Sequence, residues 1–300
     1  MISRKSKDKK MKYPAPGKLV NVNWHEMHVY SEGQGEKTFV FMAGNGTPCP
    51  TIDFKPLWSL LSDSNRIAVV EKAGYGWSET TQTSRDLDTV LEESRKALRR
   101  AKIDGPYYLV AHSLSGLEAI YWAQKYPEEV KAIIGLDTGV PEVYGVMKRP
   151  PLLVFKALSF LSGLSVNDES TSATCKKHFP SFESASLTDD DRAMYMDAFR
   201  HKAFSSDMIN EMKCMKEYAN AVTALPLPTD TPIYFVISNW GGKPANGIKP
   251  EEWAKMLKDF LSSFKNAKYL ELNCGHYVHS CEPAIIADEI NAFLNEPLLK

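Results

Sequence analysis

The sequence predicts one α/β domain built on a mostly parallel sheet, with a helical insertion late in the chain. Short segments rich in β-branched and aromatic residues alternate with longer amphipathic segments, and strands joined by helices pair in parallel through right-handed crossovers. This alternation stops between Pro141 and about Leu227, where no strand pattern occurs, and then resumes. Of the 300 residues, 43% are apolar and 24% are charged, which allows a large core and excludes wholesale disorder.

Eight segments are predicted strands, because each is short, apolar and bounded by polar or turn-forming residues. One example is Lys37–Ala43, a run of aromatic and β-branched residues that ends at Gly44. Along the chain the predicted strands are Lys18–Asn23, Glu26–Tyr30, Lys37–Ala43, Arg66–Val70, Tyr107–His112, Val130–Leu136, Ile233–Ser238 and Lys268–Leu272.

The segments between these strands are predicted helices, because their apolar residues recur every three or four positions. In Asp86–Ala101, for instance, Leu87, Val90, Leu91 and Leu98 fall on one side of a charged helix. The predicted helices are Ile52–Ser62, Asp86–Ala101, Leu114–Lys125, Thr188–Phe204, Ser206–Ala224, Pro250–Phe264 and Pro283–Leu294.

These elements divide the chain into a basic tail of residues 1–14, an α/β core of residues 15–140 and 229–300, and a helical cap of residues 141–228. The tail carries six basic residues against one acid, and no apolar stretch follows it, so we expect a solvated, disordered tail rather than a secretory signal. A weak contact with anionic lipid, or the remnant of a membrane anchor, is the alternative.

Charge and composition exclude several classes of function. The net charge of −1 offers no basic field for DNA or RNA, so nucleic acid is not an expected partner. No run reaches the 18 or so apolar residues of a membrane span. Five cysteines are too few, and odd in number, for a disulfide scaffold; unpaired cysteines suit a reducing compartment, so we expect a cytoplasmic protein.

Ser113 stands where a nucleophile would. The segment Y-L-V-A-H-S-L-S-G joins a predicted strand directly to a predicted helix, and a serine on so sharp a turn projects its hydroxyl above the sheet. The flanking positions two before and two after must be small, and here they are Ala111 and Ser115. Ser115 is the rival nucleophile, although Leu117 would crowd its turn; the plain alternative is a serine that caps the helix.

The chain resembles the α/β-hydrolase superfamily, in particular its cap-bearing serine hydrolase branch with a G-Y-G-x-S turn. The resemblance covers about residues 18–298 and implies an eight-stranded sheet flanked by helices, with a helical cap inserted after strand 6. It depends on four motifs in the family's order: Ala43-Gly44-Asn45-Gly46, Gly74-Tyr75-Gly76-Trp77-Ser78, the turn around Ser113, and Gly275-His276.

In such a family the oxyanion hole consists of two backbone N–H groups. One belongs to the residue after the nucleophile, here Leu114, and the other to the turn after the third strand, here Asn45. The family usually has His-Gly at this turn, whereas this chain has Ala43-Gly44, which bears on the rigidity of the loop rather than on its chemistry.

The resemblance also points to the general base, which a serine nucleophile needs at neutral pH. His276 follows the eighth predicted strand and precedes the last helix, as the base does in the family. His279 is expected to shape the same loop, and His112 to pack beside the site. Cys274, His276, His279 and Cys281 could also be read as a metal site, but structural zinc usually takes two separated pairs of ligands.

The acid that orients the histidine is expected to be Asp137. The family generally places this acid after the seventh strand, where this chain has no carboxylate in residues 237–243. Some members carry it at the tip of the sixth strand, which here ends in Leu136-Asp137. If Asp137 has only a structural role, Asn239 is the alternative that could orient His276 without charge.

Together these residues predict a cofactor-free, metal-free serine hydrolase that cleaves a carboxylic ester of a small apolar substrate. Thioesters, lactones and amides remain open, and an inactive receptor of the same fold is the alternative from another class. Dehalogenases and epoxide hydrolases of this fold use an aspartate nucleophile, so Ser113 argues against both. The cap methionines, Met208, Met212 and Met215 among them, are expected to pack on the core or to form an apolar wall for the substrate, to which Trp58 and Trp240 could add. The oligomeric state is left open.

Overall fold

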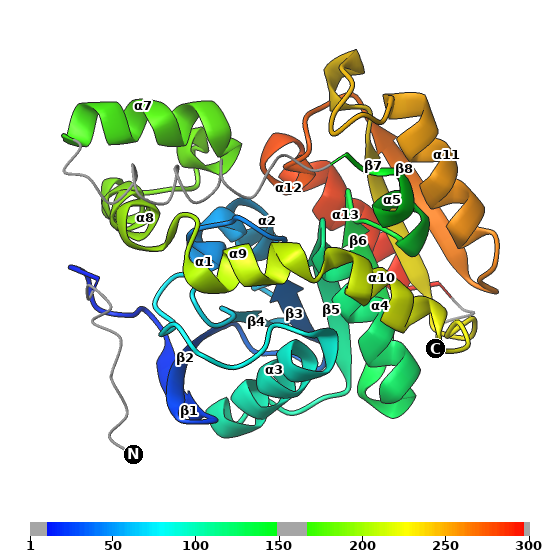
Figure 1. Ribbon diagram of the computed structural model, residues 1–300, viewed down its shortest axis with the longest axis horizontal. Helices are drawn as coiled ribbons and strands as arrows, with labels where there is room; N and C mark the ends of the chain where they lie inside the picture. Colours follow the sequence, from blue (N-terminus) through cyan, green and yellow to red (C-terminus); the bar gives the residue numbers. More distant parts are fainter. Residues whose placement is uncertain (1–10, 149–166, 297–300) are drawn as a thin grey trace.

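The computed structural model describes residues 11–148 and 167–296, and its centre is one eight-stranded sheet (Figure 1). The strand order is β1-β2-β4-β3-β5-β6-β7-β8; β1 and β2 form an antiparallel hairpin, β2 pairs antiparallel with β4, and the remaining pairs are parallel. All eight predicted strands are present: β1 (Lys18–Val22), β2 (His25–Glu32), β3 (Thr38–Met42), β4 (Arg66–Val70), β5 (Tyr107–His112), β6 (Val130–Leu136), β7 (Ile233–Ser238) and β8 (Ala267–Leu272).

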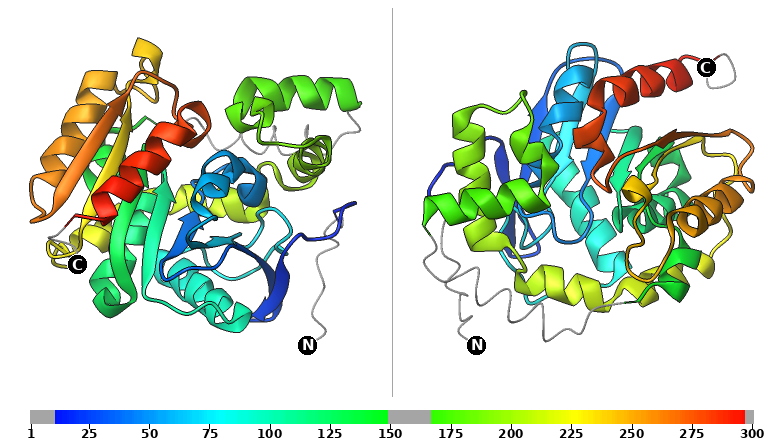
Figure 2. Two further views of the ribbon diagram at one scale, coloured as in Figure 1. Left: turned by 180° about the vertical axis from the view of Figure 1, so that it is seen from behind. Right: turned by 90° about the horizontal axis from the view of Figure 1, so that it is seen from above.

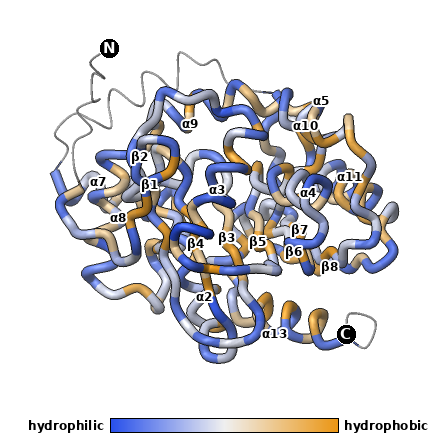
Figure 3. The backbone as a smooth tube through the Cα atoms, turned by 90° about the horizontal axis from the view of Figure 1, so that it is seen from below, coloured by the Kyte–Doolittle hydropathy of each residue, from blue (hydrophilic) through white to orange (hydrophobic). Residues whose placement is uncertain are grey.

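Helices cover both faces of this sheet (Figure 2). One face packs against α3 (Leu87–Ala101), α4 (Ser115–Lys125) and α11 (Pro250–Leu261), and the other against α2 (Lys55–Leu61) and α13 (Pro283–Leu294). Every residue of β3 is therefore buried, which explains why its sequence is continuously apolar. In Figure 3 the hydrophobic stretches gather along these central strands and along α13.

The segment between β6 and β7 is helical, as the fold class predicts. Its described helices are α5 (Pro141–Val146), α7 (Asp168–His178), η2 (Pro180–Glu183), α8 (Asp189–Lys202), α9 (Ser206–Lys213) and α10 (Met215–Thr223). The predicted boundaries of the cap, 141 and 228, stay a prediction. Residues 1–10 of the predicted tail and residues 149–166 of the predicted cap lie outside the described residues.

Two predicted helices are each divided in the structure. The prediction of one helix over Ser206–Ala224 is wrong, because α9 ends at Lys213 and α10 begins at Met215, with Cys214 between them outside helical geometry. Met208 and Met212 therefore lie on α9, whereas Met215 lies on α10. The predicted helix Ile52–Ser62 is likewise two short helices, α1 (Pro50–Asp53) and α2, joined at Phe54.

A buried aspartate ties the cap to the core. Asp53, fully buried on α1, accepts hydrogen bonds from the hydroxyls of Ser181 at 2.6 Å and Tyr195 at 3.0 Å, both in the cap. Its other oxygen accepts from Nε2 of His279 at 3.0 Å, on the short helix α12 (Val278–Cys281). His279 thus fixes the last loop of the core, as the sequence predicts. Among the described residues, no helix is long and apolar enough to cross a membrane.

Candidate active site

Ser113 occupies a strained turn between β5 and α4. Its φ of 55° lies in the left-handed region, which non-glycine residues adopt at a cost of about 1 kcal/mol or more. Its carbonyl accepts hydrogen bonds from Gly116 N at 3.1 Å, Gly139 N at 2.9 Å and Thr138 Oγ1 at 3.1 Å, which hold the turn. A Cβ on Gly116 would lie 2.0 Å from Thr138 Oγ1, so glycine is required there. The turn presents a half-buried serine at the carboxyl end of the sheet.

Ser115, the rival nucleophile, has a structural position. It is fully buried, and its Oγ lies 2.6 Å from the carbonyl of Met42 on β3 and 2.9 Å from that of His112 on β5. The hydroxyl therefore joins the ends of two neighbouring strands. This contact holds the serine away from the cavity beside Ser113.

His276 follows β8 and pairs with Asp137. Its Nδ1 lies 2.6 Å from Oδ2 of Asp137, while the His276 side chain is 36% exposed and the Asp137 side chain is fully buried. Because an ionised carboxylate only accepts hydrogen bonds, we assign the proton of the neutral imidazole to Nδ1. Nε2 then carries a free lone pair, and His276 lines the same cavity as Ser113.

Asp137 follows β6 in a left-handed conformation, with a φ of 43°. Besides His276, its carboxylate accepts from Ser238 N at 2.9 Å, from Trp240 Nε1 at 2.9 Å and from Trp253 Nε1 at 2.8 Å. The amide and the two indole groups are neutral donors. Hydrogen bonds to the charged form favour an ionised carboxylate in a buried position.

Asn239, the alternative to Asp137, is directed elsewhere. Its Nδ2 donates to Asn273 Oδ1 at 2.9 Å, and its Oδ1 accepts from Gly241 N at 3.0 Å. The structure therefore brings Asp137, and not Asn239, to His276.

The turn Ala43–Gly46 lies against the nucleophile. A Cβ on Gly44 would come within 2.6 Å of Ser113 Cβ and 2.9 Å of the His112 carbonyl, so glycine permits this close approach. Within residues 11–148 and 167–296, the backbone N–H groups of Asn45 and Leu114 have no hydrogen-bond partner. Both amides are thus available to a bound ligand.

The side chain of Asn45 binds the cap and not the cavity. Its Nδ2 donates at 2.8 Å to the carbonyl of Met208 and at 2.8 Å to Oε2 of Glu211, both on α9. Glu211 also accepts from Tyr75 in the G-Y-G-W-S turn and from Lys72. Helix α9 therefore anchors the turn that carries the Asn45 amide.

This anchor continues as a buried ionic network. Lys72 also donates to Glu118 of α4 at 2.6 Å. Burial raises the pKa of Glu118 to about 7, despite the attraction of Lys72. Burial also acts to raise the pKa of Glu211. The charge of Lys72, together with the hydrogen bonds that Glu211 accepts, outweighs this effect, so the pKa of Glu211 is lowered. One cation between two carboxylates leaves Glu118 as the member that most readily binds a proton.

His112 packs beside His276, as predicted. The two rings have centroids 4.7 Å apart, and Nε2 of His112 lies 3.2 Å from the carbonyl of His276. Burial, followed by the neighbouring His276 and His279, lowers the pKa of His112 well below its usual value. Because His276 and His279 each bind a carboxylate, they do not converge with Cys274 and Cys281, and the described residues contain no cluster suited to a metal.

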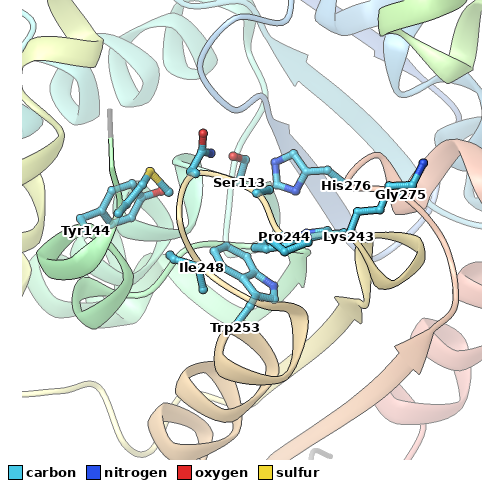
Figure 4. Close-up of a pocket in the computed structure, with 12 residues that line it drawn as sticks. Ser113, Tyr144, Lys243, Pro244, Ile248, Trp253, Gly275 and His276 are labelled. Carbon is cyan, nitrogen blue, oxygen red and sulfur yellow. The ribbon is translucent and has the colours of Figure 1, made fainter. Parts of the chain in front are cut away.

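A cavity of about 330 Å³ opens in front of Ser113 and His276 (Figure 4). Its walls are mainly apolar and come from α5, from the segment after β7 and from α11. The other lining residues are Tyr144, Met147, Trp240, Lys243, Pro244, Ala245, Asn246, Ile248, Trp253 and Gly275.

The walls differ in part from those expected from the sequence. Trp240 lines the cavity, whereas Trp58 is buried beside Thr51 and does not. Of the cap methionines, Met147 lines it, but Met208 and Met215 do not. The segment after β7, rather than α9, therefore supplies much of the described surface that would meet a substrate.

Sequence reasoning missed Trp253 and Tyr144. Trp253 belongs to the apolar stripe of α11, which is typical of a helix packed on a sheet, so its second role as a donor to Asp137 has no local signal. Trp253 and Asp137 are 116 positions apart in the sequence. They meet because β6, which precedes Asp137, and β7, which precedes α11, are neighbours in the sheet.

This fold and site define a member of the α/β-hydrolases, and comparison with known proteins agrees. A family model of the α/β-hydrolase fold matches residues 54–282, so the chain belongs to this family. YbdG of Bacillus subtilis (strain 168), an uncharacterized protein, is 35% identical over 269 residues, which cover 89% of this chain and 82% of that protein.

One further relative and one similar solved structure carry names that describe a reaction. The 2-(acetamidomethylene)succinate hydrolase of Mesorhizobium japonicum is 26% identical over 118 residues, or 39% of this chain and 41% of that protein. The solved structure of a haloalkane dehalogenase DbeA-M1 loop variant from Bradyrhizobium elkanii has a TM-score of 0.63 and 15% identity, and the match covers 92% of this chain and 95% of that one. This structural likeness concerns the fold alone.

Proposed function

We propose that the protein is a cofactor-free serine hydrolase that transfers an acyl group to water. Ser113 is the nucleophile, His276 the general base and Asp137 the acid that orients it. The observation that carries the proposal is the position of His276, whose Nδ1 lies 2.6 Å from Asp137 while its ring and Ser113 line one cavity. The membership of the hydrolase family and the name of the M. japonicum relative support hydrolysis as the class of reaction.

The proposed mechanism follows from the assigned tautomer. Nε2 of His276 takes the proton of the Ser113 hydroxyl as Oγ attacks the substrate carbonyl, and Asp137 stabilises the imidazolium that forms. The amides of Leu114 and Asn45 donate to the oxyanion of the tetrahedral intermediate, each worth about 3 kcal/mol by analogy with other oxyanion holes. His276 returns the proton to the leaving alcohol, and the same steps with water release the acid.

The proposed substrate is a small carboxylic ester with an apolar acyl part. A cavity of about 330 Å³ suits a ligand of modest size, and its walls are largely aromatic and aliphatic. Among the described lining residues, Lys243 is the one lysine or arginine, and it is exposed at the edge of the cavity. We therefore expect the cavity to discriminate between esters by the length of their acyl chain.

The test combines a panel of p-nitrophenyl esters of increasing acyl length with a fluorophosphonate probe. We expect hydrolysis with a clear optimum in length, and labelling that Ser113→Ala abolishes. Ser62→Ala is the matched control, because its partly exposed hydroxyl donates only to a neighbouring helix carbonyl and should leave both results unchanged. Folded protein that hydrolyses no ester and never reacts with the probe would instead identify a ligand-binding protein of this fold.

The proposed cellular setting is a reducing one. All five cysteines are free, and two of them, Cys49 and Cys175, are buried. Burial raises the pKa of Cys49 well above its usual value, which keeps the thiol protonated and unreactive. We therefore propose a cytoplasmic location, which fractionation of cells that express the full chain would test.

A further inference from the structure

Two tryptophan side chains bind the carboxylate of Asp137 from different elements. Nε1 of Trp253, on α11, lies 2.8 Å from Oδ1, and Nε1 of Trp240, in the turn η3 (Trp240–Gly242), lies 2.9 Å from Oδ2. Each oxygen thus receives one indole N–H besides its other partner, Ser238 N on Oδ1 and His276 on Oδ2. The indoles complete the coordination of a carboxylate that has no exposed surface.

The chemistry of these donors is unusual for a buried carboxylate. Buried carboxylates in proteins are commonly paired with lysine or arginine, whose charge would compete with an imidazolium for the same oxygen. An indole N–H satisfies an acceptor without adding a charge. Asp137 therefore keeps its negative charge for His276 while all its lone pairs are used.

The same two indoles form part of the substrate cavity. Both Trp240 and Trp253 line it together with Ser113 and His276, and their rings contact each other with centroids 4.9 Å apart. In Figure 4, Trp253 extends from α11 to the side of the cavity opposite Ser113. Each indole thus forms part of the cavity wall, while its N–H group is directed to Asp137.

The backbone at Trp240 indicates that its side chain is needed. Its φ of 51° is left-handed, which costs a bulky residue about 1 kcal/mol or more and would suit glycine or asparagine. The next two residues are the glycines that such a turn favours. A tryptophan in this position is explained by what its side chain contacts.

We propose that Trp240 and Trp253 are positioning residues that hold Asp137 ionised and aligned on His276 from within the wall of the substrate cavity. The inference rests on the proposed function of this site. It adds to the proposed site two residues that do not touch the reacting atoms. Each acts through its indole N–H group, and not only as an aromatic ring in the cavity wall.

The proposal predicts the direction of a pH effect. Without an indole N–H, the carboxylate is less stabilised, so it attracts a proton more strongly and also favours the imidazolium of His276 more strongly. Both effects move the protonation of the coupled Asp137–His276 pair to higher pH. In a plot of kcat/KM against pH, the fall in rate on the acid side (the acid limb) should therefore move to higher pH when the indoles are replaced.

Three titratable groups around His276 have pKa values shifted away from this range. Burial lowers the pKa of His112 well below its usual value, so that it stays neutral. Burial raises the pKa of Tyr277 and raises that of Cys274 to about 12, so both stay protonated.

The experiment compares Trp240→Phe, Trp253→Phe and the double variant with Trp58→Phe. Phenylalanine keeps an aromatic wall but lacks the N–H. Trp58 is a matched control, because it is buried and its Nε1 also donates to an oxygen, the Thr51 carbonyl, away from the cavity. Two readouts are used: the pH dependence of kcat/KM, and nitrogen-15 NMR titration of the His276 ring, assigned with His276→Gln.

We expect each site variant to move the His276 titration and the acid limb upward together, by about one pH unit in the double variant. Trp58→Phe should move neither titration. Unchanged titrations in both single variants would overturn the inference. If Trp253→Phe does not fold, Trp240→Phe, on a partly exposed turn, decides the matter alone.

The two proposals fail separately. The NMR titration requires no substrate, so a protein that hydrolyses no ester still tests whether the indoles act on the Asp137–His276 pair. Conversely, ester hydrolysis that depends on Asp137, with no shift in the tryptophan variants, retains the proposed function and removes the role of the indoles.

Discussion

Replacement of Asp137 by asparagine tests the hydrogen bonds around His276 in the proposed mechanism. Oδ1 accepts from the Ser238 amide and the Trp253 indole, and Oδ2 accepts from the Trp240 indole and from Nδ1 of His276. An amide nitrogen cannot accept a hydrogen bond. In the variant, one of the two oxygen positions therefore becomes a donor that faces two other donors.

Both orientations of the new amide harm the site. If its nitrogen faces His276, the imidazole must carry its proton on Nε2, toward Ser113, and cannot accept the hydroxyl proton. If the amide is reversed, two buried donors lose their acceptor, at about 1–3 kcal/mol each. The tautomer effect alone predicts a fall in kcat of about 10⁴-fold, the size seen for the equivalent change in a serine protease, which is about 5 kcal/mol of transition-state stabilisation.

The assay is the initial rate of p-nitrophenyl ester hydrolysis, with Tm measured on the same samples. Asp53→Asn is the matched control, because Asp53 is likewise a buried aspartate that binds a histidine, His279, but it lies outside the cavity. We expect Asp53→Asn to lower Tm and to keep kcat within about tenfold of the wild type. An Asp137→Asn protein with a rate within about tenfold of the wild type would refute the reasoning.

Three further predictions concern residues that pack around the site. Gly44→Ala would place a Cβ 2.6 Å from that of Ser113, so kcat in the ester assay should fall by about 100-fold or more, whereas Gly145→Ala, whose Cβ meets nothing within 4 Å, should match the wild type. Ser115→Ala removes a buried hydroxyl that donates to strand carbonyls, so urea titration should show a loss of about 1 kcal/mol while fluorophosphonate labelling persists. Burial raises the pKa of Glu118 from 4.5 to about 7, so the protonated Glu118 stabilises the fold at low pH and this stabilisation is lost as pH rises through that range. Glu118→Gln should therefore flatten the pH dependence of the free energy of unfolding and raise that free energy by at most about 3 kcal/mol at pH 8. Full activity in Gly44→Ala, lost labelling in Ser115→Ala, or an unchanged pH dependence in Glu118→Gln would contradict them.

The strands were predictable because their composition alone identifies them. In β3 every residue is buried between two layers of helices, so the segment is apolar throughout and no other element fits it. Helix α7 was not predicted, because only Thr171 and Cys175 in it are buried and its sequence has no apolar stripe. The break between α9 and α10 was missed for the opposite reason, since the apolar pattern runs through Cys214 and tertiary packing decides where the helix ends.

The candidate site was predictable where it depends on local turns. Ser113 sits between a strand and a helix with small flanking residues, and His276 follows the last strand, so both have local signals. Asp137 could be proposed only with Asn239 as an alternative, because the choice depends on which side chain reaches His276 across β7. The indole donors were beyond reach, since they depend on contacts between residues more than 100 positions apart.

The most direct test of the central proposal is to trap the acyl-enzyme. A p-nitrophenyl ester is mixed with the full chain, the reaction is stopped with acid within the first turnover, and the peptides are analysed by mass spectrometry. The mechanism predicts the mass of the acyl group on the peptide that contains Ser113, and its absence in His276→Ala. Hydrolysis that continues while this peptide stays unmodified, or an acyl group on another residue, would contradict the assignment of Ser113 as the nucleophile.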